Sequence, residues 1–101
     1  MTLRMVRYQT HATKADENQR LIEDVFRELR AASPPGVRYL VLRLPDATFV
    51  HLVEVGQGAG AHPLTALAAF GAFQAGQRDR CVGPPQSSEV TVVGSHGMLG
   101  S

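Results

Sequence analysis

The sequence predicts an α+β protein whose elements follow the order βαββαβ. Three observations lead to this class. A segment with apolar side chains at helical spacing follows a strand-like segment. Two strand-like segments joined by a short turn come next. A second apolar helical segment then precedes a final strand-like segment. The length of 101 residues is that of a single domain, with a core over about 3–95 and a tail over 96–101.

The first elements are a strand and a long helix. Residues 3–11 alternate apolar side chains with Arg4, Arg7 and Gln9, as a half-buried strand does. Apolar side chains at i, i+1, i+4, i+5 and i+8 then form one helical stripe: Leu21, Ile22, Val25, Phe26 and Leu29. Acidic residues suit the first turn of this helix, and the sequence SPPG at 33–36 ends it.

A β-hairpin is predicted in the middle of the chain. Its strands are 37–44 and 48–55, and Pro45-Asp46 supplies the turn signal. Both faces of the first hairpin strand are apolar, so both need burial.

The last third of the chain predicts a loop, a helix and a strand. The glycine-rich loop covers 56–63, the helix runs from Leu64 to about Cys81, and the strand covers 89–93. The loop fits the pattern G-x-G-x-x-A of a dinucleotide site. However, only one strand follows it, and His62-Pro63 separates the glycines from the helix. We therefore interpret it as a lid over a cavity mouth.

The resulting order is the ferredoxin-like arrangement, in which four antiparallel strands carry both helices on one face. The other face then has no helix to cover it. A second copy of the same sheet is the simplest cover for an apolar face, so we expect a homodimer.

Composition excludes several classes of function. Ten basic and nine acidic residues give a net charge of +1, and the basic residues are dispersed, so no nucleic-acid partner is expected. No apolar run approaches the roughly 20 residues of a membrane span, and no signal peptide is recognisable. The single Cys81 forms no internal disulfide, which favours a reducing cytoplasm. No metal site is expected, because the histidines lack ligand spacing.

Candidate catalytic groups lie on the predicted hairpin. His51 shares a strand face with Phe49, and Tyr39 on the neighbouring strand is within reach of it. This Tyr39–His51 pair is the best catalytic candidate, and Tyr8 is an equal candidate for the same cavity. The alternative is that all three are packed, hydrogen-bonded structural residues. Glu54 lies on the opposite face, where Arg43 or Arg7 is the expected ion-pair partner.

Several segments together resemble the antibiotic-biosynthesis-monooxygenase-type domains of the dimeric α+β barrel family. They are Phe49, Val50 and Glu54 on one strand, His62-Pro63, the pair Phe70 and Phe73 on the second helix, and the closing strand VTVV. The resemblance covers about residues 3–95. It implies a homodimer whose sheets form a barrel, and a small-molecule cavity between each sheet and its helices.

We expect ligand contacts in this cavity from seven residues: Tyr8, Phe49, His62, Leu67, Phe70, Phe73 and Gln74. The haem-degrading branch of the family binds iron through a histidine on the second helix. Residues 64–81 contain none, so no cofactor is expected. The only asparagine, Asn18, falls in the first predicted helix rather than on a cavity strand.

Three functions stay open at this point. The first is a cofactor-independent, monooxygenase-like enzyme acting on a hydrophobic or aromatic molecule. The second is a non-catalytic ligand-binding module, and the third is a structural dimer. An enclosed cavity of about 300 Å³ or more that is lined by His51 favours the first two. A sheet–helix interface filled by Phe26, Phe70 and Phe73 would exclude both.

Overall fold

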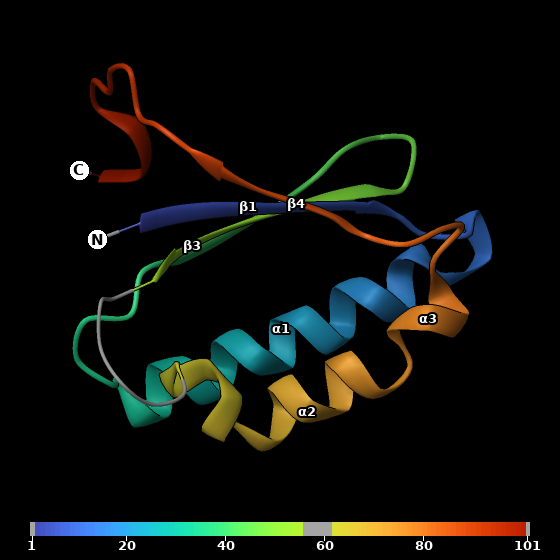
Figure 1. Ribbon diagram of the computed structural model, residues 1–101. Coiled ribbons are helices and arrows are strands. Elements are labelled where there is room, and N and C mark those ends of the chain that lie inside the picture. Colours follow the sequence, from blue (N-terminus) through green and yellow to red (C-terminus); the bar gives the residue numbers. More distant parts are fainter. Residues whose placement is uncertain (1, 56–61, 101) are drawn as a thin grey trace.

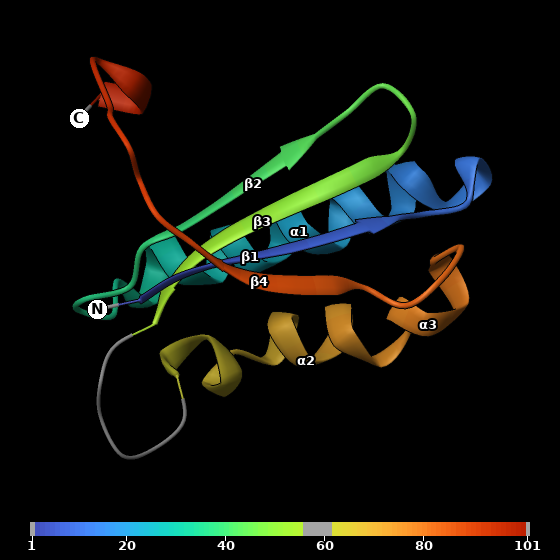
Figure 2. The same ribbon diagram turned by 45° about the horizontal axis from the view of Figure 1, so that its top comes forward.

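The computed structural model describes residues 2–55 and 62–100, in which a four-stranded antiparallel sheet lies on a layer of helices (Figure 1). The strands are β1 (Thr2–Gln9), β2 (Tyr39–Arg43), β3 (Thr48–Val55) and β4 (Gln86–Val90). Their order in the sheet is β2-β3-β1-β4 (Figure 2). The predicted α+β class and βαββαβ order are thereby confirmed.

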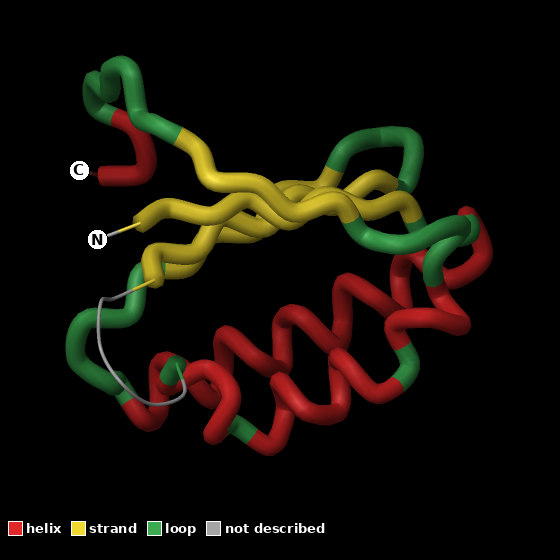
Figure 3. Tube along the Cα trace, viewed as in Figure 1, coloured by secondary structure: helices red, strands yellow, loops and turns green. Residues whose placement is uncertain are grey.

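Helices α1 (Ala15–Ala32), α2 (Ala68–Ala75) and α3 (Gln77–Arg80) lie on one face of this sheet, together with the short 3₁₀ helices η1 (Ala12–Lys14) and η2 (Pro63–Ala66) (Figure 3). The 3₁₀ helix η3 (Met98–Gly100) lies on the other side of the sheet, beyond the end of β4. Helix α1 buries Ile22 and Val25 of its predicted stripe. It ends where Ser33 adopts the left-handed conformation (φ 44°) and donates its N–H to the carbonyl of Leu29.

The sheet register determines which side chains meet the helices. Strand β1 pairs with β3 so that Val6 lies opposite His51 and Tyr8 opposite Phe49. Because side chains alternate along a strand, these four residues all face the helix layer. Most of the core lies between the two layers: Tyr8, Ala15, Ile22, Val25, Ala47, Phe49, Leu64, Ala69, Phe73 and Cys81.

The segment predicted as one helix from Leu64 to Cys81 is instead three short helices. Pro63 begins η2, and His62 caps it by accepting a hydrogen bond from the Leu64 N–H. Leu67 is extended (φ −83°, ψ 130°) and separates η2 from α2. Gly76, a weak helix former, then separates α2 from α3. The prediction of a single helix was wrong. It rested on the apolar residues of this segment, and their pattern does not reveal the breaks at Leu67 and Gly76.

Strand boundaries also differ from the predictions. Strand β4 covers Gln86–Val90 rather than 89–93, because it pairs with β1 and Val90 already lies opposite Leu3 near the start of that strand. Beyond it, Val93 is 98% exposed, and the chain continues away from the sheet on the helix-free side (Figure 1). Strand β1 begins one residue earlier than predicted and ends at Gln9 rather than at residue 11, and β2 covers Tyr39–Arg43 rather than 37–44.

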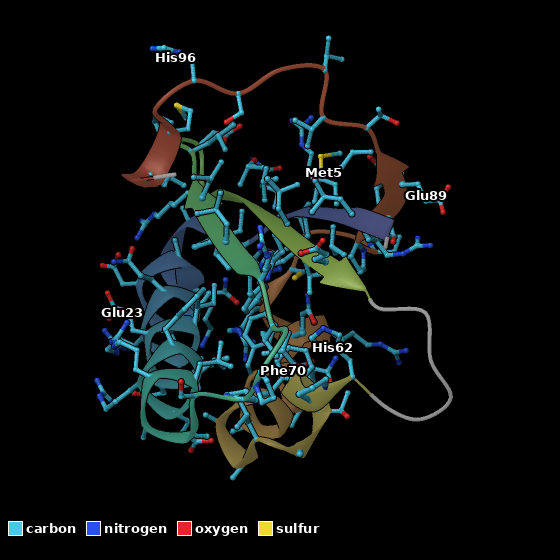
Figure 4. All side chains as sticks on the ribbon, turned by 90° about the vertical axis from the view of Figure 1, so that its left-hand side faces the viewer. Met5, Glu23, His62, Phe70, Glu89 and His96 are labelled. Carbon is cyan, nitrogen blue, oxygen red and sulfur yellow. The ribbon has the colours of Figure 1, made fainter. Side chains whose placement is uncertain are left out.

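The helix-free face of the sheet has an apolar centre, with polar side chains such as Arg7 and Glu54 around it. It carries Leu3 and Met5 of β1, Leu40 of β2, and Val50 and Leu52 of β3, which alternate with the residues that face the helices. Figure 4 shows Met5 on this side of the sheet and Phe70 on the other. Helices α1, α2 and α3 all lie on the opposite face, and the short η3 lies on this side but beyond the end of β4 (Figure 1).

Candidate functional site

A buried histidine joins three neighbouring strands at the centre of the helix-facing side of the sheet. His51 lies opposite Val6 of β1 and Val41 of β2. Tyr8 and Tyr39 are therefore its diagonal neighbours on the same face. The Tyr8 hydroxyl lies 2.8 Å from Nε2 of His51, and the Tyr39 hydroxyl lies 2.6 Å from Nδ1. The structure thus brings together the three polar residues that the sequence singled out.

The hydrogen-bonded chain continues from Tyr8 into the helices. Asn18 of α1, which is 0% exposed, donates from Nδ2 to the Tyr8 hydroxyl over 3.0 Å. Arg80 of α3, which is 3% exposed, donates from Nε to Oδ1 of Asn18 over 2.9 Å. A second donor of Arg80, Nη2, bonds the carbonyl oxygen of Phe73. The chain thus runs from β2 through the sheet to α1 and α3.

Sequence reasoning missed Asn18 and Arg80. Asn18 had one usable signal, because it lies four residues before Ile22 and so continues the apolar stripe of α1. A polar residue at such a position is buried and needs partners. Arg80 had no comparable signal, because its burial depends on the breaks around Gly76 that place α3 against α1.

Burial keeps the three polar groups at the centre of this hydrogen-bonded chain, His51, Tyr8 and Tyr39, neutral. Removal from water lowers the pKa of His51 to about 4. The same cause raises the pKa values of the Tyr8 and Tyr39 hydroxyls well above their ordinary range. At neutral pH the chain therefore consists of a neutral imidazole between two neutral phenols, with one cation, Arg80, at its far end.

A cavity of about 120 Å³ lies beside this chain. Its walls are Val6, Tyr8, Tyr39, His51, Val53, Leu64, Phe70, Phe73, Gln74 and Gln77. The cavity is lined by His51, as expected, but its volume is below the roughly 300 Å³ set above as favouring a ligand site, which is the size that accepts a drug-sized molecule. It is of the order that holds one aromatic ring. The Phe73 ring, whose centroid is 5.5 Å from that of His51, supplies an aromatic wall.

Six of the nine predicted site residues line the cavity: His51, Tyr39, Tyr8, Phe70, Phe73 and Gln74. Phe49 lies behind them, stacked on Tyr8 with ring centroids 5.8 Å apart. Leu67 packs against the core at the break before α2. His62 lies at the start of η2 (Figure 4), where Nε2 donates to the carbonyl of Glu54 over 3.1 Å. These last three are not among the lining residues.

The predicted ion-pair partner of Glu54 was wrong. Glu54 is paired with Arg38, whose Nε lies 3.2 Å from Oε2 without hydrogen-bond alignment, rather than with Arg43 or Arg7. Arg43 instead contacts Asp16 of α1. Cys81 is a buried, packed residue, and burial raises the pKa of its thiol against the opposing effect of Arg80.

Three further expectations concern regions or groups away from the cavity. The proposed lid at 56–61 lies outside the described residues. Among residues 2–55 and 62–100, no cluster of three or more His, Cys, Asp or Glu side chains is placed to bind a metal ion. In the same residues, no helix has the length and apolar character needed to cross a membrane.

Comparison with known proteins identifies the fold. A putative antibiotic biosynthesis monooxygenase from Nitrosomonas europaea superposes with a TM-score of 0.71 at 15% identity, covering 92% of this chain and 99% of that one. One from Caulobacter crescentus gives 0.72 at 17%, with coverages of 92% and 90%. A mutant of SnoaB, a cofactor-independent oxygenase from Streptomyces nogalater, gives 0.63 at 15%, with coverages of 93% and 94%.

No family model and no curated protein matches the sequence. The likeness is therefore one of structure at low identity, and it confirms the expected architecture. The chain has the ferredoxin-like α+β fold of the antibiotic-biosynthesis-monooxygenase-like domains.

Proposed function

We propose that this protein binds a small hydrophobic molecule with an aromatic ring in the cavity beside His51. One observation carries the proposal. A hydrogen-bonded Tyr39–His51–Tyr8 group forms part of a cavity that is otherwise apolar and aromatic and is the size of one ring. Ligand sites in proteins combine an apolar wall with a few placed polar groups in this way.

Protonation behaviour supports binding ahead of acid–base catalysis. Both nitrogens of His51 are bonded to tyrosine hydroxyls. With its pKa lowered to about 4, His51 is a weak base. Tyr39 is a weak acid for the same reason of burial. General acid–base catalysis works best with groups whose pKa values are near the working pH.

Oxygenation without a cofactor is the second candidate. It is favoured by the Tyr39 hydroxyl on the cavity wall, which lies 2.6 Å from His51, and by the likeness in fold to SnoaB, a cofactor-independent oxygenase. The balanced reaction would convert an activated CH₂ group and O₂ into a carbonyl group and water, with all electrons supplied by the substrate.

The active form in this proposal is a cytoplasmic homodimer. The apolar helix-free face carries Leu40, Val50 and Leu52, which are only partly buried in the single chain. A second copy of this sheet is the occupant that we infer, because the same face is offered by both partners. The single cysteine, Cys81, suits a reducing compartment.

Titration with acetophenone, followed by amide ¹H–¹⁵N spectra, tests ligand binding. We expect the largest shifts at Leu64 and Gln74, two residues of the cavity wall. Val53→Phe should fill the cavity and abolish these shifts. Val93→Phe, the same substitution at an exposed position, should leave them unchanged. Shifts that persist in Val53→Phe would place the ligand elsewhere and contradict the proposal.

The two candidate functions are separated by turnover. Any molecule retained by the purified protein is identified by mass spectrometry and offered with O₂ to the wild type and to His51→Ala. Oxygen uptake that disappears in the variant supports oxygenation, and no uptake by the wild type supports binding alone.

A further inference from the structure

Arg80 fixes the direction in which protons are donated along the buried chain. A guanidinium group has only donors. The atom of Asn18 that faces Arg80 Nε at 2.9 Å must therefore be the carbonyl oxygen. This orientation directs the amide nitrogen of Asn18 to the Tyr8 hydroxyl, which accepts the hydrogen bond. The amide of Asn18 thus has one possible orientation.

The next two bonds follow from this orientation. Because Tyr8 accepts from Asn18, its own proton is available for Nε2 of His51 at 2.8 Å. A neutral imidazole carries one N–H, so Nδ1 then holds the ring proton and donates it to the Tyr39 oxygen. In the opposite direction, Tyr8, which is 3% exposed, would receive two donors and its proton would lack an acceptor among the hydrogen bonds of the described residues. In the chosen direction the unused proton belongs instead to Tyr39, which is only partly buried, and an unused donor costs less where it is less buried.

The last member of the chain is therefore a donor that is not used within it. Tyr39 accepts from His51, and its hydroxyl proton has no acceptor among the described hydrogen bonds. Tyr39 also lines the cavity. The positive charge of Arg80 lies at the far end, and no carboxylate of the described residues forms an ion pair with it. Successive bonds in such a chain polarise one another, which strengthens the final donor.

We propose that Asn18 and Arg80 are positioning residues that make the Tyr39 hydroxyl a hydrogen-bond donor to the bound molecule, so that the site selects an aromatic molecule with an acceptor oxygen, such as a ketone. This inference rests on the proposed binding function and narrows its ligand class. It assigns no contact between the ligand and Asn18 or Arg80, which act through Tyr8 and His51.

The first test is the tautomer of His51 in the ligand-free protein, measured by ¹⁵N NMR of the imidazole. We expect a protonated Nδ1 and an unprotonated Nε2 in the wild type. The substitution Asn18→Asp is nearly isosteric. It should reverse the direction in which the hydrogen bonds are donated, because a carboxylate accepts from both Arg80 and Tyr8. Tyr8 would then accept from Nε2–H of His51. Asp16→Asn, an exposed change on the same helix, is the control and should keep the wild-type tautomer.

The second test uses two probes of the same shape, acetophenone and α-methylstyrene, which differ by a carbonyl oxygen against a CH₂ group. Because both probes have the same shape, a change in cavity size between the wild type and a variant affects both Kd values alike and cancels in their ratio. We expect the preference for acetophenone to fall about three- to tenfold in Asn18→Asp and in Tyr39→Phe, relative to the wild type, which is the range for one hydrogen bond.

A wild-type Nε2–H tautomer would overturn the inference whether or not the variant folds. A ratio that is unchanged in Tyr39→Phe would overturn it as well. If neither probe binds the wild type, the proposed function fails for this ligand class. The direction of the chain is still decided by the tautomer, so the two failures are distinguishable.

Discussion

The hydroxyl of Tyr39 lies 2.6 Å from Nδ1 of His51 because the β2–β3 hairpin places them diagonally on one face of the sheet. The other nitrogen of the same ring contacts Tyr8 of β1. A single side chain thus connects three strands and, through Asn18 and Arg80, the helices. The residues that line the cavity are also residues that hold the two layers together, so changes to them should affect stability and binding together.

The free energy of unfolding should decrease as the pH is lowered and His51 becomes protonated. Its pKa is about 4 in the folded state against about 6.5 unfolded, so the unfolded state binds more protons in this interval. Stability is complete above pH 6.5 and falls as the pH approaches 4. Urea unfolding at pH 7 and 4.5 should differ by about 2–3 kcal/mol from this group. His51→Gln should reduce the difference, whereas His96→Gln, in the exposed tail, should not. An equal difference in both variants would exclude His51 as the source.

Arg80 should contribute strongly to stability, unlike its neighbour Arg78. Arg80→Met leaves the Asn18 and Phe73 oxygens without their donor, and we expect a loss of about 2–4 kcal/mol in the free energy of unfolding. Arg78→Met removes a charge at an exposed position and should change it by less than about 0.5 kcal/mol. Similar denaturation midpoints for the two variants would show that the buried guanidinium is not an anchor.

Two glycines near Arg80 should respond to alanine with opposite signs. A Cβ at Gly76 would lie 2.8 Å from Nη1 of Arg80, a side chain held by its hydrogen bonds. Gly76→Ala should therefore cost about 1–2 kcal/mol of stability. At Gly71, an exposed position of α2, a Cβ meets nothing within 4 Å, so Gly71→Ala should add about 0.5–1 kcal/mol. Thermal unfolding measures both, and stabilisation by Gly76→Ala would contradict the packing described.

Self-association should depend on the helix-free face of the sheet. Light scattering should give the wild type twice the monomer mass at micromolar concentration. Leu52→Lys places a charge on that face and should give a monomer, because a buried unpaired charge is strongly unfavourable. Val82→Lys, at an exposed position outside the sheet, is the matched control and should stay dimeric. A monomeric wild type would exclude the homodimer.

The fold could be predicted because most of its elements are marked by periodic patterns of apolar residues within a single segment of the sequence. The helical stripe from Leu21 to Leu29 and the alternation in Thr48–Val55 are periodic patterns, and both elements appear as expected. The second helical segment failed because its breaks at Leu67 and Gly76 depend on the cap at His62 and on the docking of Arg80. The predicted bounds of β4 were wrong because they are set by its pairing with β1.

The candidate site was predictable only where strand geometry determined it. Tyr8, Tyr39 and His51 share a face through the alternation of side chains along each strand and the register between the strands, and the structure joins them. Asn18 and Arg80 are 62 residues apart in sequence, and they join the hydrogen-bonded chain of Tyr8, His51 and Tyr39 from two different helices. No spacing rule connects such positions, because their proximity is produced by the packing of α1 against α3.

The central claim is that an aromatic molecule binds beside His51 in hydrogen-bonding distance of Tyr39. Its most direct test is the measurement of intermolecular nuclear Overhauser effects between acetophenone and the protein at saturation. The predicted result is a set of contacts from the ligand ring to the rings of Tyr39, Phe70 and Phe73. Contacts only to residues outside the cavity, or none at saturating ligand, would contradict the account.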